Sequence, residues 1–421
     1  MHFNQVIGQK HIKEQLVQMI RQNRLSHALL FLGKEGTGGL PLALAFAQYL
    51  VCEKVNQPNK KTNSAPPESS LFDSPATAVS PDASLPENSS FPEENIDSCG
   101  VCPDCVKSAK FIHPDIHYSY PIITTKKSDK PTSKDFIIQW RSFLNEQPYG
   151  NNYDWLQFIE AENKQGNITA NECSEIGRNM SLKSFESGYK VLIMWMPEFL
   201  GNQGNKLLKL IEEPPPNTLF IFVAENDKLI LPTICSRLQL IKLAPLSTNE
   251  IEAALELREG ISVPKAMQVA AVSQGNYHEA LAQLQHADND WQTLLRDWMN
   301  TIIKTGPAAQ VEWIEEVAKL GREKQKQFLN YFNHLLEQAI KLSIMGIAEE
   351  MGNVSESQAA IRDFALRMNK LCDLSQQEAI IHEIDQAAYF IERNANGKLL
   401  FHALTIKLYH IISNKSVILI Q

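Results

Sequence analysis

The chain has 421 residues, of which 43% are hydrophobic and 21% charged, and its formal net charge is −8. This length exceeds one ordinary hydrophobic core, so two or three domains are expected. The acidic balance argues against a protein that holds nucleic acid alone by neutralising phosphates, because that mode needs a basic excess. The N-terminal stretch is charged, and no apolar run approaches the roughly 20 residues of a membrane-spanning helix. A cytoplasmic, non-membrane protein is expected.

Short apolar runs alternate with helical patterns over the first 243 residues. The candidate strands are residues 28–32, 116–123, 191–196, 219–223 and 238–243. A glycine-rich turn and a helix over about 41–52 follow the first strand, and a helical pattern over 202–213 stops at three prolines. Strands that alternate with helices predict right-handed crossovers and a mostly parallel sheet covered on both faces.

A polar insertion interrupts this pattern at residues 53–98. It holds seven of the 21 prolines together with many Ser, Asn and acidic residues. Such a composition cannot bury enough apolar surface to offset its ordering entropy, so we expect a disordered surface loop.

Strand signals largely vanish after residue 243. Ser247 and Glu250 have the spacing of a capping box, and apolar periods near 3.6 continue to the end, with helices expected at 291–303, 325–342 and 398–412. The predicted organisation is an α/β domain at 1–243, a short helical unit at 244–287 and a larger helical domain at 288–421.

Four cysteines flank the insertion. Cys99, Cys102 and Cys105 form two overlapping C-x-x-C steps, and Cys52 supplies a fourth thiol. Four thiolates can close a tetrahedral shell around a structural Zn²⁺, in which no position stays open for water. The alternative to a zinc site is that the three clustered cysteines are reduced surface thiols and that Cys52 is unrelated to them. Chance rarely places three cysteines at this spacing, so zinc is favoured. Ordinary packing is expected for the isolated cysteines, which are Cys173, Cys235 and Cys372.

The glycine-rich turn at residues 33–40 stands where a phosphate-binding loop would. Its glycines are Gly33, Gly36, Gly38 and Gly39, but Gly39 and Leu40 replace the Lys and the Ser/Thr of the G-x-x-x-x-G-K-[ST] pattern. The ammonium that neutralises phosphates and one Mg²⁺ ligand are therefore missing. The strand at 191–196 leads into Trp195 and Met196 rather than acidic residues, and Glu198 comes two positions late. These losses favour a loop kept for packing.

Several segments occur in the order seen in bacterial clamp-loader subunits, and the chain resembles this family of the AAA+ superfamily. They are FNQVIGQKHIKEQL, RLSHALLFLGKEGTGG, the cysteine cluster, HPDIH, YKVLIMWMPEFL, NKLLKLIEEPP and LPTICSRL, with a weaker match at NANGKLLFHALTIKL near the end. The resemblance is dense to residue 243 and thin afterwards. It implies an ATPase-like α/β domain with a zinc module, a helical lid and a helical collar for oligomerisation.

The resemblance also separates motor subunits from the others. Motor subunits carry an intact phosphate loop, an acidic pair and a sensor arginine, and this chain has His278 at the sensor position. Arg237 stands at the position of the family's arginine finger, although Leu238 replaces the following cysteine. The combination is similar to the delta-prime type of subunit, which does not hydrolyse ATP but presents an arginine to a neighbour's ATP.

The implied cofactor is structural Zn²⁺, with ATP not bound. The implied partners are the motor (gamma/tau) and delta subunits, a sliding clamp and primed DNA. One alternative is a divergent, ATP-hydrolysing motor subunit that uses Lys34 or Glu198. Another, an independent zinc-dependent nucleic-acid binder, is disfavoured by the acidic charge.

An aromatic segment at residues 133–158 has no place in the family pattern. It contains Trp140, Tyr149, Tyr153 and Trp155 with few basic residues, so packing against the sheet is favoured over base stacking.

Overall fold

The computed structural model describes most of the chain as two compact units. The first unit comprises Met1–Ala161 and Gly166–Ala280, and the second comprises Leu281–Gln421 with the short stretch Glu162–Gln165. The described residues are 1–56, 97–124, 131–161, 164–285, 291–303, 307–345, 356–392 and 395–414. The predicted surface loop at 53–98 thus falls almost wholly outside the described residues, and its first residues form the short helix α3 (Glu53–Asn56).

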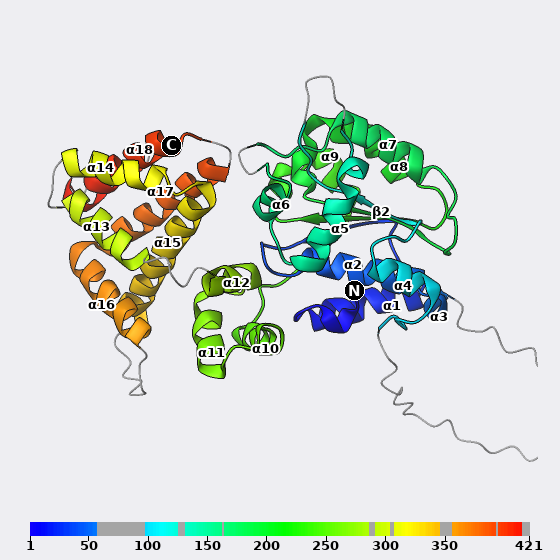
Figure 1. Ribbon diagram of the computed structural model, residues 1–421, viewed down its shortest axis with the longest axis horizontal. Coiled ribbons are helices and arrows are strands. Elements are labelled where there is room, and N and C mark those ends of the chain that lie inside the picture. Colours follow the sequence, from blue (N-terminus) through cyan, green and yellow to red (C-terminus); the bar gives the residue numbers. More distant parts are fainter. Residues whose placement is uncertain are drawn as a thin grey trace, which may run out of the picture. The chain divides into compact units, whose positions relative to one another are not determined.

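A five-stranded parallel sheet forms the centre of the first unit (Figure 1). Its order is β2-β3-β4-β1-β5, and every neighbouring pair is parallel. The strands are β1 (Ala28–Leu32), β2 (Ile116–Ser119), β3 (Lys190–Trp195), β4 (Thr218–Ala224) and β5 (Gln239–Lys242). Each predicted strand is present, but β2 ends at Ser119, two residues before Pro121, and not at residue 123 as predicted. The central strands are continuous apolar runs because both faces of the sheet are covered.

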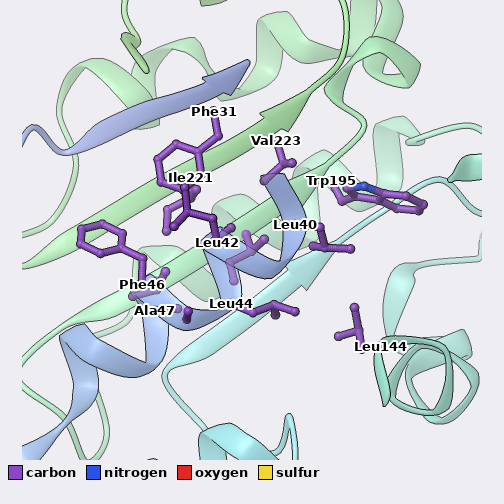
Figure 2. Packing of buried hydrophobic residues seen from close by; sticks show 14 of the residues in the cluster. Phe31, Leu40, Leu42, Leu44, Phe46, Ala47, Leu144, Trp195, Ile221 and Val223 are labelled. Atoms are coloured by element: carbon purple, nitrogen blue, oxygen red, sulfur yellow. The ribbon is translucent and has the colours of Figure 1, made fainter. Parts of the chain in front are cut away.

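Helices cover the two faces of the sheet. One face packs against α1 (Lys10–Arg21), α2 (Gly39–Val51) and α5 (Ile137–Glu146), and the other against α7 (Ala170–Met180), η3 (Pro197–Leu207), α8 (Leu208–Glu212) and α9 (Pro232–Cys235). Side chains alternate along each strand, so Ile221 of β4 lies in the first core and Phe220 and Phe222 lie in the second. Figure 2 shows the first core, with α2 laid against the strands.

The helix expected at 202–213 is shorter than predicted. Only Leu208–Glu212 is α-helical, and Pro197–Leu207 forms 3₁₀ turns that are broken where Gly201 adopts φ 49° and ψ −149°. The segment from 201 to 205 contains two glycines and two asparagines, whose helix propensity is low. The apolar spacing that predicted one long helix is therefore divided between a 3₁₀ segment and a short α-helix.

Three helices follow the sheet: α10 (Thr248–Glu259), α11 (Val263–Val272) and α12 (Tyr277–Gln285). The predicted capping box is present at the start of α10, where the Glu250 backbone N–H donates to Ser247 Oγ at 3.3 Å and the Ser247 N–H donates to Glu250 Oε2 at 2.8 Å. The first compact unit keeps these helices with the sheet as far as Ala280. The division into three domains stays a prediction.

The second unit is helical throughout its described residues. Its helices are α13 (Trp291–Ile303), α14 (Pro307–Ala318), α15 (Arg322–Met345), α16 (Glu356–Leu371), α17 (Leu374–Glu392) and α18 (Gly397–Asn414). Trp298 and Trp313 stack at the centre of its core, with ring centroids 4.8 Å apart, and Trp298 Nε1 donates to Thr405 Oγ1. Across the described parts of both units, no helix combines the length and apolarity needed to cross a membrane.

Candidate functional site

The glycine-rich loop joins β1 to α2, as its place in the sequence predicted. Gly36 and Gly38 have φ of 72° and 90°, a left-handed conformation that side chains disfavour. The hydroxyl of Thr37 donates to the carbonyl of Lys34 at 2.7 Å, so it is used within the loop itself. The loop keeps the tight turn of a phosphate-binding loop without its lysine and its terminal hydroxyl.

Side chains of the same unit cover the outer face of this loop. A Cβ added to Gly36 would lie 1.8 Å from Asn276 Oδ1, and one added to Gly38 would lie 3.2 Å from the ring of Tyr149. The backbone N–H of Tyr277 donates to the Gly36 carbonyl at 3.3 Å. The cavity left at the loop has a volume of about 40 Å³, whereas small-molecule and cofactor sites typically enclose roughly 300–1,000 Å³. The chain itself occupies most of this space.

His278 links the residues that cover the loop to the loop itself through two ion pairs. Its Nδ1 lies 2.6 Å from Glu35 Oε1 in the loop, and its Nε2 lies 2.6 Å from Asp154 Oδ2 in α6 (Asn152–Phe158). The Asn151 amide also donates to Glu35 Oε1 at 3.1 Å. Burial opposes the charged imidazolium, but the two carboxylates outweigh burial and raise the pKa of His278 well above 6.5. A cation therefore ties the loop to two other segments.

We expect replacement of His278 by glutamine to destabilise the first unit in a pH-dependent way. Removing one partner of a buried ion pair typically costs about 3–5 kcal/mol. Because the pKa is raised on folding, the ion pairs stabilise fully below about pH 6.5, the unfolded value, and lose this effect as pH rises toward the folded pKa. Urea unfolding at pH 6 and pH 9 measures the difference. The exposed His27→Gln is the control, and an equal loss of stability at both pH values would contradict the ionic role.

Apolar side chains stand where Mg²⁺ ligands would be needed. Leu40, in the place of the loop hydroxyl, and Trp195, in the place of an acidic residue, are 4% and 3% exposed and belong to one core (Figure 2). The Trp195 ring lies 5.2 Å from that of Trp140. Both positions contribute to packing and offer no oxygen to a hard cation.

Glu198 holds the turn that follows β4. Its Oε1 accepts hydrogen bonds from the backbone N–H groups of Glu225 and Asn226 at 2.7 and 2.9 Å. Burial raises the pKa of Glu198, and these hydrogen bonds act in the opposite direction. The Glu198 carboxylate therefore stabilises this turn through hydrogen bonds to its backbone.

The four cysteines of the predicted metal site come together. Cys52 follows α2, Cys99 lies in the next described loop, and Cys102 and Cys105 begin α4 (Pro103–Ala109). Their sulfurs all lie within 4.8 Å of one another, with Cys99 Sγ and Cys105 Sγ 3.9 Å apart. A tetrahedral shell with Zn–S bonds of about 2.3 Å requires sulfurs about 3.8 Å apart. The donor set and its spacing fit a closed four-thiolate metal site.

Backbone N–H groups support the thiolate form at this cluster. The N–H groups of Cys99, Cys102 and Cys105 donate to the sulfurs of Cys52, Cys99 and Cys102, each at 3.4 Å. Burial disfavours ionisation of Cys99, but hydrogen bonds from the backbone N–H groups of Val101 and Cys102, together with the side chains of Cys102 and Cys52, outweigh burial and lower the pKa of Cys99 to about 7. Burial raises the pKa of Cys102 and Cys105, so a bound cation would have to supply the charge that keeps these two deprotonated.

A second group of possible ligands lies beside the cysteines but does not suit a metal. Asp104, His113 and Glu186 have their ligand atoms within 4.8 Å of one another. His113 Nδ1 accepts a hydrogen bond from the Asp115 N–H, which places the ring proton on Nε2, the atom that faces Asp104 at 3.4 Å. In addition, the Lys107 ammonium already pairs with Glu186. We therefore interpret this group as an internal polar contact.

Arg237 lies just after α9, at the surface of the first unit. Its side chain is 34% exposed and pairs with Glu212, the last residue of α8. Arg237 Nη1 also donates to the Thr233 carbonyl at 2.6 Å. The predicted finger is thus accessible and is held by residues of its own chain.

The aromatic segment at 133–158 packs against the sheet, and this prediction is confirmed. Trp140 and Trp155 are fully buried, and Trp140 stacks on Tyr120 with ring centroids 4.0 Å apart. The same segment also supplies Tyr149 to the cover over the glycine-rich loop. Sequence reasoning missed Tyr149, Asn276 and Tyr277, because their role depends on contacts between distant segments.

The parallel sheet, its helices and the glycine-rich loop define a P-loop NTPase-like α/β domain of the AAA+ type. The family model described as "DNA polymerase III, delta subunit" matches residues 8–69 and 65–247, and the chain belongs to this family of clamp-loader proteins. The sequence resemblance is thereby confirmed.

Two relatives and one solved structure are similar to this chain. DNA polymerase III subunit delta' of Bacillus subtilis is 24% identical over 273 residues, which are 65% of this chain and 58% of that protein. DNA polymerase III subunit gamma/tau of Mycobacterium tuberculosis H37Rv is 23% identical over 277 residues, 65% of this chain and 34% of that protein. The match thus spans less than two thirds of either relative. A gamma subunit-related protein of Thermotoga maritima has 13% identity and a TM-score of 0.35, over 94% of this chain and 98% of that one.

Proposed function

We propose that this chain is a non-hydrolysing clamp-loader subunit of the DNA polymerase III holoenzyme, which supplies Arg237 to the ATP of a neighbouring subunit. One observation carries the proposal: the chain's own glycine-rich loop is covered by Tyr149 and Asn276, while Arg237 stays at the surface. The partners would be the motor (gamma/tau) and delta subunits, a sliding clamp and primed DNA within the complex.

The loss of an intrinsic nucleotide site is supported at three positions. Gly39 gives no ammonium for phosphate, and Leu40 gives no oxygen for Mg²⁺. His278, which stands where motor subunits carry a sensor arginine, is engaged with Glu35 and Asp154. A nucleotide would have to displace this cover and break both ion pairs.

Arginine suits the retained role. Its guanidinium is planar, always charged and able to contact phosphate oxygens in a bidentate manner. A subunit without a working site can still contribute to catalysis at the neighbouring site, because such a residue acts in trans.

The four cysteines are proposed to hold one structural Zn²⁺. Cys52, Cys99, Cys102 and Cys105 would be its ligands, and a closed thiolate shell leaves no position for substrate. Zinc would join the end of α2 to the start of α4, on either side of the insertion.

Isothermal titration of the purified chain with Mg²⁺ and ATP tests the proposal against a motor subunit that uses Lys34 or Glu198. We expect no saturable heat at micromolar nucleotide, because the cover fills the phosphate loop. A purified motor subunit is the positive control. Tight binding by this chain would support the ATP-hydrolysing alternative.

Reconstitution tests the place in the complex. The chain should co-purify with motor and delta subunits from cell extract, and a complex assembled without it should load clamps poorly. Assembly and loading at full rate without this chain would refute the proposed role.

A further inference from the structure

Every nitrogen of the Arg237 guanidinium has a partner within the chain. Nε donates to Glu212 Oε1 at 2.5 Å, and Nη2 pairs with the same oxygen. Nη1 donates to the Thr233 carbonyl at 2.6 Å and to Ser236 Oγ at 3.1 Å. A guanidinium in this state has to exchange at least one partner before it contacts a phosphate in a bidentate manner.

Glu212 is the partner that can be exchanged. Thr233 and Ser236 belong to the same short turn as Arg237, whereas Glu212 comes from α8. Its side chain is 45% exposed, and a single oxygen makes both contacts. A carboxylate close to a phosphate is also repelled by it, so an incoming nucleotide weakens this contact and leaves the other two in place.

We propose that Glu212 is a positioning residue that retains Arg237 on the unassembled subunit and yields it to the phosphates of a neighbour's nucleotide. This inference rests on the proposed function of Arg237. In the free subunit the Glu212 carboxylate holds the Arg237 guanidinium. In the assembled complex the phosphates of the neighbour's nucleoside triphosphate take the place of this carboxylate. Exposed ion pairs contribute little free energy, so replacing Glu212 by phosphate as the partner of Arg237 has a small cost. Abolishing the pair is therefore expected to change the ATPase rate by about two- to fivefold.

The test is the DNA-stimulated ATPase of the reconstituted complex, with kcat and KM for ATP measured separately. We expect Glu212→Gln to raise kcat/KM about two- to fivefold at low salt, because the neutral amide holds Arg237 less strongly. The gain should shrink at high salt, which screens the wild-type ion pair. Glu213→Gln makes the same charge change one residue away, at an exposed position, and should leave the rate unchanged. In an Arg237→Ala background, Glu212→Gln should have no effect.

The outcomes separate this inference from the proposed function. Suppose that Arg237→Ala lowers the ATPase rate, whereas Glu212→Gln gives a rate equal to or below that of the wild type. The retaining role of Glu212 is then wrong, and the proposed role of Arg237 as a finger still stands. If Arg237→Ala has no effect, the proposed function itself fails.

A measurement on the free chain tests the retaining contact without the assembled complex. The Nε–H resonance of Arg237 should be protected from solvent exchange in the wild type and lose this protection in Glu212→Gln. An unprotected wild-type resonance would also overturn the inference.

Discussion

Replacement of Cys105 by serine, or chelation of the metal, is expected to unfold the four-cysteine module while the parallel sheet stays folded. The apolar cluster of the module consists chiefly of the cysteines themselves, with Val55 packed against it. Its helix α4 has seven residues, well below the roughly 12–15 that an isolated helix needs. Structural zinc contributes about 10–16 kcal/mol in zinc-finger peptides. We therefore expect the proposed metal to supply most of the stability of the module.

Elemental analysis and hydrogen exchange measure this effect. We expect one zinc per wild-type chain, loss of that zinc in Cys105→Ser, and loss of amide protection in residues 97–109 with protection retained in β4. Cys173→Ser is the matched control: Cys173 is 1% exposed in α7 and outside the cluster, so this variant should keep its zinc. A full complement of zinc in Cys105→Ser, or none in the wild type, would contradict the predicted ligand set.

The sheet could be predicted from sequence because its signals are local. A parallel strand that is buried on both faces must be apolar along its whole length, and β1 has the predicted bounds, Ala28–Leu32. The cysteine cluster could be predicted for a similar reason, because three of the four cysteines are close in sequence. The fourth, Cys52, could be joined to them because a long insertion adds little to the cost of closing the loop.

The cover over the glycine-rich loop could not be predicted, because it depends on contacts between distant segments. Tyr149 and Asn276 are separated from the loop by more than a hundred residues, and nothing in their spacing indicates that they meet there. His278 was singled out only by comparison with the family, which gave no indication of its pairing with Glu35 and Asp154. Sequence showed which groups the loop lacks, and the structure adds what occupies the space.

Replacement of Arg237 by alanine is expected to lower the DNA-stimulated ATPase at the site that it serves by about 10³-fold or more, the effect of a trans arginine in well-studied GTPases. Assembly should be intact, because the contacts of Arg237 with Glu212 and Thr233 are local and exposed. Arg237→Lys should restore little activity, since an ammonium lacks the planar fork that contacts two phosphate oxygens. Arg178→Ala is the control, because Arg178 is also exposed and ion-paired but lies in α7. Single-turnover hydrolysis in the reconstituted complex isolates the chemical step from product release, and a wild-type rate in Arg237→Ala would exclude the finger role.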